Sequence, residues 1–145
     1  MVTLTFDRVR HTTAVTPDDI RPLIHDVDPT APGYGDHLSF DAILRRCGLA
    51  WTAFLNDLDG FDGGVIVPRL TVDYLSEVHT GTLDIDVAVV RIGTTSFTVR
   101  CSVSQDGRPA ASVDVVLVSF GYDDRRPVPL SDEQRRQLER VTVPG

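Results

Sequence analysis

The second half of the chain alternates apolar and polar residues with a period of two, and this feature constrains the fold most strongly. Three segments share the pattern, 65–78, 83–89 and 97–103, and a fourth, 113–120, is predicted to be a strand apolar enough to be covered on both faces. The period is typical of β-strands that bury one face. Turn signals separate the segments at Gly81, at Gly93 and at Asp106-Gly107, the last of which favours a tight hairpin. Since parallel strands need long crossover connections, these short spacings predict four antiparallel strands in a meander.

A long amphipathic helix is predicted ahead of these strands, over residues 39–58. Its apolar residues fall on one face at helical spacing: Ile43, Cys47, Ala50, Trp51, Phe54 and Leu58. Ser39 is the predicted N-cap, and Asp41 lies in the first turn, where the helix dipole favours an anion. Because glycine costs about 1 kcal/mol relative to alanine inside a helix, we expect Gly48 to allow close packing against a sheet.

The first third of the chain contains a further strand and a long irregular segment. Residues 3–15 alternate like a strand, and Thr16 followed by Pro17 predicts the start of a short helix. Residues 26–36 are rich in turn formers and have no apolar period. Long irregular connections in compact domains are uncommon and tend to be functional, so this segment is the first place to look for a site.

A capping box at the other end of the chain, made by Ser131 and Gln134, predicts a short C-terminal helix that ends near residue 140. Residues 1–145 are therefore predicted to form a single α+β domain, in which one long helix packs on an antiparallel sheet of about five strands. One helix cannot cover such a sheet completely. We therefore expect a homo-oligomer, dimer or tetramer, to bury the remaining apolar surface.

Composition excludes several classes of function. The chain has 21 acidic and 14 basic residues, a net charge of −7, and no cluster of cations, so nucleic acid is not an expected partner. No apolar run approaches the roughly 20 residues of a membrane span, and the start lacks the layout of a signal peptide. We expect a cytoplasmic protein without a membrane partner. The two cysteines and four histidines show no metal-ligand spacing, so neither a metal nor a cofactor is expected.

Three stretches resemble a known family. Residues 35–51 (GDHLSFDAILRRCGLAW) are similar to a Gly-His-Val-Asn-Asn entry into a long helix. Residues 67–103 are similar to the second, third and fourth strands of that family. Residues 106–130 are similar to its last strand and to an Arg-Pro-x-Pro-Leu exit into a terminal helix. The family that these stretches resemble is the 4-hydroxybenzoyl-CoA thioesterase-like group of hotdog-fold acyl-CoA thioesterases.

The resemblance implies a fold and an activity. The implied fold is the hotdog, an antiparallel sheet of about five strands wrapped around one long central helix, with a short C-terminal helix. The implied activity is hydrolysis of an acyl or aroyl thioester of coenzyme A or of an acyl carrier protein, at a homodimer interface and without a cofactor. The alternative is a hotdog protein that binds an acyl thioester or a polyketide-like intermediate without hydrolysing it. A cone-shaped α+β fold ranks behind both, because its helices normally precede most of the sheet.

Thioester hydrolysis needs a carboxylate as base or nucleophile and donors for the developing oxyanion, and the free N–H groups at a helix start are such donors. Asp36 and His37 qualify as catalytic candidates by proximity to the predicted helix. Asp28 completes an Asp-x-Asp pattern like that of the family and qualifies if the segment between it and His37 folds back. Asp19 and Asp41 are further possible equivalents of the family's carboxylate, and each also fits the simpler role of a helix-terminus acid.

Four residues are candidates for substrate binding: Ser39, Asp41, Tyr34 and Arg69. Ser39 is first an N-cap and second a hydroxyl donor to substrate. Tyr34 lies in the irregular segment that leads to the long helix. Arg69 lies on a predicted strand, where it could meet the nucleotide of coenzyme A or form a salt bridge on the strand surface.

Overall fold

The computed structural model describes residues 8–20, 37–61 and 64–143. Within these residues the chain forms six strands and two α-helices, in the order β1 (Arg8–Val15), α1 (Phe40–Asn56), β2 (Val65–Tyr74), β3 (Gly81–Ile92), β4 (Ser96–Gln105), β5 (Arg108–Gly121), β6 (Arg126–Pro127) and α2 (Asp132–Arg140). A single 3₁₀ turn, Pro17–Asp19, follows β1.

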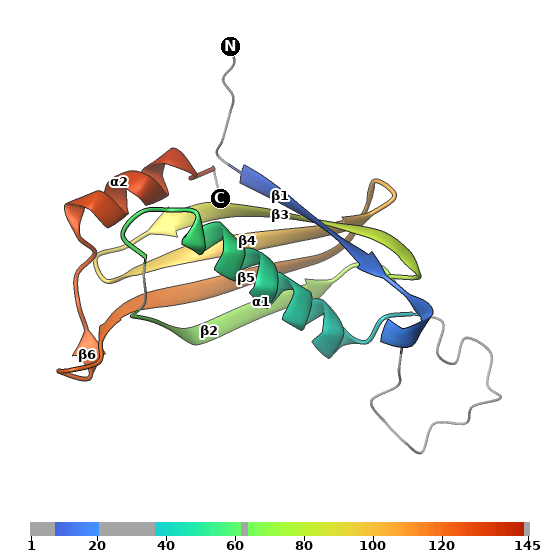
Figure 1. Cartoon of the computed structure of the whole chain (residues 1–145), viewed down its shortest axis with the longest axis horizontal. Helices are drawn as coiled ribbons and strands as arrows, with labels where there is room; N and C mark the ends of the chain where they lie inside the picture. Colours follow the sequence, from blue (N-terminus) through green and yellow to red (C-terminus); the bar gives the residue numbers. More distant parts are fainter. Residues whose placement is uncertain (1–7, 21–36, 62–63, 144–145) are drawn as a thin grey trace, which may run out of the picture.

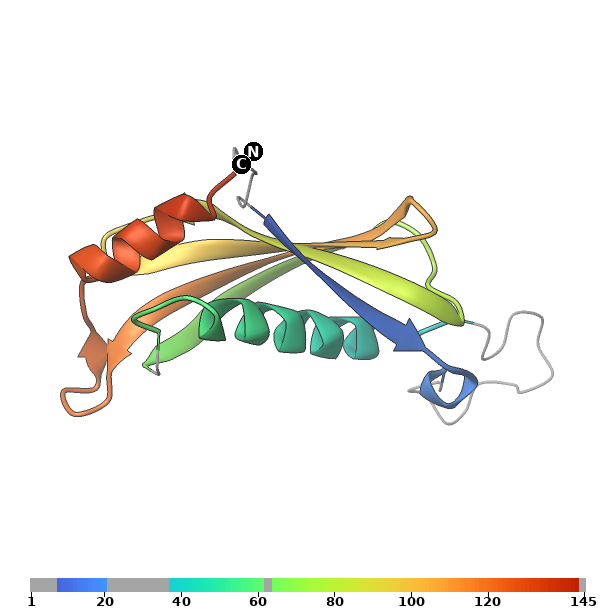
Figure 2. The same ribbon diagram turned by 45° about the horizontal axis from the view of Figure 1, so that its top comes forward.

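Five of the strands form one antiparallel sheet in the order β1-β3-β4-β5-β2, and β6 pairs with the end of β5 (Figure 1). The helix α1 lies lengthwise along one face of this twisted sheet, and α2 lies near one end (Figure 2). The arrangement confirms the predicted α+β class, with an antiparallel sheet around one long helix and a short C-terminal helix.

The predicted meander is wrong for β2. Strands β3, β4 and β5 do follow one another as neighbours, but β2 pairs with β5 at one edge of the sheet instead of with β3. The connection 75–80 crosses the ends of β5 and β4, where the N–H groups of Leu75 and Ser76 donate to the carbonyl of Ala110 at 2.8 and 3.2 Å. These bonds give partners to two backbone N–H groups where the connection passes the start of β5. Short spacing predicts the antiparallel sense of a strand but does not determine its neighbour.

The core lies between α1 and the inner face of the sheet. On α1 the predicted apolar face is confirmed at Ile43, Cys47, Ala50 and Phe54, which are buried, while Trp51 is only partly buried. The sheet contributes alternate residues, as the period of two requires. The largest of these fully buried side chains are Leu83, Ile85, Val87, Val89, Phe97, Val99, Val103 and Leu117.

The expected packing role of Gly48 is wrong. A Cβ added at this position would have Trp51 Nε1, at 4.0 Å, as its one contact among the described residues. The space beside Gly48 is therefore not filled by the sheet, and Gly48 does not bring the helix closer to the sheet. Its backbone is helical, so neither close approach nor conformation requires a glycine here.

The ends of the described chain follow the sequence predictions. The capping box of α2 is confirmed, since Ser131 Oγ accepts from the Gln134 N–H at 3.1 Å and Gln134 Oε1 accepts from the Ser131 N–H at 2.9 Å. The predicted strand 3–15 is present from Arg8 onward, and residues 1–7 lie outside the described residues. In the described part of the chain, no helix is long and apolar enough to cross a membrane.

Candidate functional site

No side chain of the described residues caps the start of α1. Ser39 holds the N-cap position with an extended backbone, and its carbonyl accepts the first intrahelical bond, from the Ile43 N–H at 3.2 Å. Its hydroxyl, however, donates to Asp41 Oδ1 at 2.6 Å and does not accept from an N–H group of the first turn. The first N–H groups of a helix have no intrahelical partner, and the dipole favours negative charge there. The start of α1 can therefore receive an anionic oxygen.

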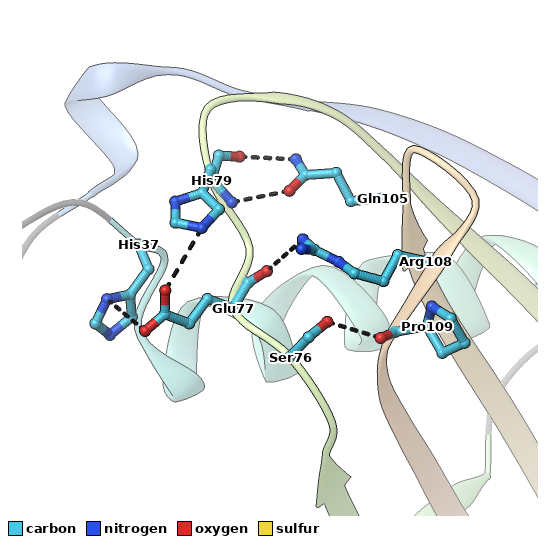
Figure 3. A network of polar contacts seen from close by, with 7 residues as sticks. All are labelled: His37, Ser76, Glu77, His79, Gln105, Arg108 and Pro109. Atoms are coloured by element: carbon cyan, nitrogen blue, oxygen red, sulfur yellow. Dashed lines mark hydrogen bonds and ion pairs between the residues drawn. The ribbon is translucent and has the colours of Figure 1, made fainter. Parts of the chain in front are cut away.

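A carboxylate and two imidazoles meet beside this helix start, and we call His37, Glu77 and His79 the Glu77 cluster (Figure 3). Glu77 Oε1 lies 3.9 Å from His37 Nδ1, and Glu77 Oε2 lies 3.5 Å from His79 Nε2. Glu77 therefore lies between the two rings. All three side chains are exposed to solvent, with Glu77 the most exposed at 61%. A group that acts on a diffusible substrate needs such access.

The backbone of the Glu77 cluster is held firmly although its side chains are exposed. The buried amide of Gln105 accepts from the His79 N–H at 2.9 Å and donates to the His79 carbonyl at 2.8 Å. Arg108 Nη2 donates to the Glu77 carbonyl at 3.0 Å (Figure 3). Both residues belong to the hairpin that the connection 75–80 crosses, so the crossing connection places Glu77 and His79.

Two further bonds join this connection and the end of β2 to the start of α1. The Leu38 N–H donates to the carbonyl of the buried Val78 at 2.7 Å. The Tyr74 hydroxyl donates to the Phe40 carbonyl at 3.0 Å, and the two rings pack edge to face at 6.4 Å. Burial, followed by the nearby Cys47 and Asp41, raises the pKa of Tyr74 above its ordinary value. The helix start is thus supported by segments more than 30 residues further along the chain.

The sequence-predicted site residues fall into three groups. Asp28, Tyr34 and Asp36 lie outside the described residues. His37, Ser39 and Asp41 come together at the start of α1. Arg69 is exposed on the edge strand β2. It lies five positions before Tyr74, which is about 17 Å along an extended strand, and so it stands apart from the helix start of its own chain.

Asp19 has a structural position at the 3₁₀ turn. The backbone N–H and the hydroxyl of Thr16 donate to its carboxylate at 2.6 and 3.0 Å and lower the pKa of Asp19 below its ordinary value. Arg46 of α1 lies 3.2 Å from the same carboxylate. Asp19 therefore caps the turn after β1 and contacts the flank of α1.

The two cysteines are free thiols in the core, Cys47 on α1 and Cys101 on β4. Cys101 Sγ donates to the Cys47 carbonyl at 3.8 Å. The hydrogen bond with the Cys47 thiol, together with burial, raises the pKa of Cys101 far above its ordinary value. Since the nucleophile of thiol chemistry is an accessible thiolate, Cys101 is not a candidate nucleophile.

A small hollow lies beside α1 and is lined by His11, Thr13, Arg46, Leu49, Ala50 and Ile85. Its volume is about 150 Å³, below the range of about 300–1,000 Å³ for sites that hold small molecules. His11 Nε2 and Arg46 Nε are buried there without a hydrogen-bond partner in the described part of the chain. Because both atoms are shielded from solvent, a ligand in the hollow cannot reach them.

Sequence reasoning missed Glu77 and His79. Neither belongs to a motif, and both lie about 40 positions after His37. Glu77 falls within the strand predicted over 65–78, which is wrong beyond Tyr74, where β2 ends, and His79 falls just before the predicted turn at Gly81. The one signal that could have identified them is the pairing of β2 with β5, which forces the connection to pass the start of α1. Among the described residues, no three His, Cys, Asp or Glu side chains form a group that could hold a metal ion.

Comparison with known proteins agrees with this fold. The family model of the thioesterase-like superfamily matches residues 22–138. A predicted thioesterase from Bacillus stearothermophilus is similar in structure with a TM-score of 0.72 and 22% identity, over 94% of this chain and 99% of that chain. A thioesterase from Thermus thermophilus, solved with coenzyme A and Zn, has a TM-score of 0.72 and 25% identity, over 89% of this chain and 95% of that chain.

A 1,4-dihydroxy-2-naphthoyl-CoA thioesterase from Synechocystis is also similar, with a TM-score of 0.69 and 15% identity, over 90% of this chain and 95% of that chain. No curated protein matches the sequence significantly. The structural matches span nearly the whole of both chains, so they compare complete folds and not fragments.

Proposed function

Since the chain belongs to the thioesterase-like superfamily and is a hotdog-fold thioesterase, we propose that it hydrolyses an acyl or aroyl thioester at the start of α1. The observation that carries this proposal is the uncapped helix start beside the Glu77 cluster. The Ser39 hydroxyl is turned to Asp41, so the first-turn N–H groups can face the thioester carbonyl. A carboxylate and two imidazoles lie within reach of the same place.

The proposed reaction uses these donors for the oxyanion. Attack of water on the thioester carbon places negative charge on the carbonyl oxygen, and preorganised N–H donors at a helix start stabilise that charge. His37, two positions before Ser39, contacts the reacting groups. A carboxylate must accept the proton of the attacking water. Asp28 and Asp36, which lie outside the described residues, are candidates for that role, and the carboxylate of the Glu77 cluster is a third.

The proposed substrate is a thioester of coenzyme A, or of an acyl carrier protein. The thioesterase from Thermus thermophilus was solved with coenzyme A, which supports the first of these carriers. Ser39 and Asp41 would contact the acyl thioester beside the helix start, with Tyr34 of the preceding segment. Arg69 would contact the phosphates of the carrier.

We propose that the working unit is a homodimer formed along the β2 edge. Large apolar side chains are exposed on and beside this edge: Phe40, Val67, Leu70, Tyr74 and Leu75. Contiguous exposed apolar surface of this kind marks interaction sites. Phe40 and Tyr74 also belong to the start of α1, so the site would adjoin the interface. Arg69, on the same edge strand, would then lie close to the partner and could contact a substrate bound at the partner's helix start.

The experiment is a continuous assay of free thiol with the purified protein and a panel of short-chain, long-chain and aroyl thioesters of coenzyme A. We expect at least one of these thioesters to be hydrolysed well above the uncatalysed rate. If the panel is extended to acyl carrier protein thioesters and none of them releases thiol faster than buffer, hydrolysis is not the function. Saturable binding of a thioester without turnover would then favour the non-hydrolytic alternative.

A further inference from the structure

We propose that Glu77 is the general base of this site, the carboxylate that takes a proton from the attacking water. The proposal rests on thioester hydrolysis at the start of α1 and assigns a residue that the sequence did not indicate. Three observations carry it: the position of the carboxylate, the two imidazoles on its two oxygens, and the firm support of the backbone behind it.

Position separates Glu77 from the other described carboxylate at this end of the helix. The Asp41 carboxylate accepts a short bond of 2.6 Å from the Ser39 hydroxyl and lies within the first turn itself. The Glu77 side chain comes from a different segment, approaches the helix start from outside, and is 61% exposed. A base must reach a water molecule above or below the plane of the thioester carbonyl, and a side chain that approaches from outside the helix can do so.

Two imidazoles face the two oxygens of the Glu77 carboxylate. His37 Nδ1 approaches one oxygen at 3.9 Å and His79 Nε2 approaches the other at 3.5 Å (Figure 3). An exposed glutamate ordinarily rotates freely, and a surface pair of this length adds little to stability. In the proposal, substrate binding brings the two rings closer to the carboxylate and fixes its orientation. Catalytic contacts that are long without substrate commonly tighten when substrate binds.

The backbone that carries Glu77 is held by hydrogen bonds to the neighbouring hairpin. A working side chain must be held within about 0.5 Å of its productive position, by a shell that is itself fixed. Gln105, only 3% exposed, bonds both backbone groups of His79, and Arg108 bonds the Glu77 carbonyl. The side chain of Val78, which lies between Glu77 and His79 in the sequence, is fully buried.

The proposed step balances without any further reactant. Water attacks the thioester carbon, its oxygen forms the new C–O bond, and one of its protons passes to a Glu77 oxygen. The tetrahedral intermediate, with its oxyanion at the α1 N–H groups, then breaks the C–S bond. The leaving thiolate takes the proton from Glu77, which returns the carboxylate to its starting form. The products are a carboxylic acid and a thiol.

The test compares Glu77→Gln with Glu77→Asp and with the control Glu139→Gln, by thiol release from the best thioester of the panel. Glu139 is exposed on α2, at the opposite end of the molecule from the start of α1 (Figure 1). Loss of a general base lowers kcat by about 10²–10⁴-fold. We expect Glu77→Gln to lose at least a hundredfold in kcat, Glu77→Asp to lose less, and Glu139→Gln to retain the wild-type rate. The thermal midpoint of Glu77→Gln should match that of wild type, since the side chain is exposed.

The role of His79 is tested by a double-mutant cycle. If His79 acts through Glu77, His79→Gln lowers kcat in the wild-type background and has no further effect in the Glu77→Gln background. Equal loss in both backgrounds would assign His79 a role apart from Glu77 and would overturn that part of the proposal.

Three results separate this proposal from the proposed function. A wild-type chain without turnover of any thioester overturns both. An active wild type together with a Glu77→Gln variant that keeps more than half of its kcat overturns the role of Glu77 alone. The same holds if Asp28→Asn or Asp36→Asn abolishes turnover while Glu77→Gln does not.

Discussion

Gln105 illustrates how one buried residue can position an exposed functional group. Its amide oxygen and nitrogen bond the N–H and the carbonyl of His79, at 2.9 and 2.8 Å. A buried amide without partners is costly, so these two bonds account for a polar side chain that is almost completely buried at the end of β4. The candidate site therefore depends on residues, such as Gln105, that do not themselves contact substrate.

We predict that Gln105→Leu destabilises the protein by about 1–3 kcal/mol, because it leaves the N–H and the carbonyl of His79 without their partners. It should also lower kcat, since His79 and Glu77 lose their support. Chemical denaturation measures the first effect and thiol release the second. Ser102→Ala, an exposed change on the same strand, is the control. Unchanged stability and unchanged kcat in Gln105→Leu would show that the amide does not hold the connection.

At the scale of helices and strands, a local sequence pattern predicts whether a segment is a helix or a strand better than it predicts which strands pair. The predicted helix 39–58 is found as Phe40–Asn56, and the Ser131 cap and all four downstream strands are present. These features follow from periodicity and caps, which act within a few residues. The pairing of β2 with β5 depends on hydrogen bonds between the connection 75–80 and a distant hairpin. The same contacts place Glu77, which explains why sequence reasoning found His37 but not its carboxylate partner.

Gly48 gives a prediction for α1 as an element. Its helical backbone and the space around its Cα position suit alanine, so Gly48→Ala should stabilise the protein by about 0.5–1 kcal/mol. The free energy of unfolding by urea measures this effect, with unchanged thiol release as a check that the site is intact. A loss of stability would mean that α1 packs more tightly at this position than the structure indicates.

At the scale of the whole molecule, the sheet has two exposed edges with different surfaces. On β1, the guanidinium of Arg10 forms a bidentate ion pair with the carboxylate of Asp86 on β3, at 2.7 and 3.0 Å. The β2 edge instead exposes Leu70 and Tyr74. Charged side chains on an edge discourage pairing with another chain, whereas exposed apolar side chains favour burial. The second edge is therefore the one proposed for the homodimer.

We predict that Leu70→Arg converts the dimer to a monomer at micromolar concentration, because it places an unpaired charge in the apolar interface. Sedimentation velocity measures the change in mass. Thr71→Arg adds the same charge to the opposite face of β2 and should leave the dimer intact. A wild-type chain that sediments as a monomer, or a Leu70→Arg variant that stays dimeric, would place the interface elsewhere.

The most direct test of thioester chemistry at the start of α1 is an NMR titration with a coenzyme A analogue in which a methylene group replaces the thioester sulfur. The account predicts that the largest backbone amide shifts occur at 37–42 and at 76–79, the helix start and the connection that carries Glu77. Saturation of the protein by the analogue without shifts at the first-turn amides of α1 would contradict the account, because the carbonyl would then bind elsewhere.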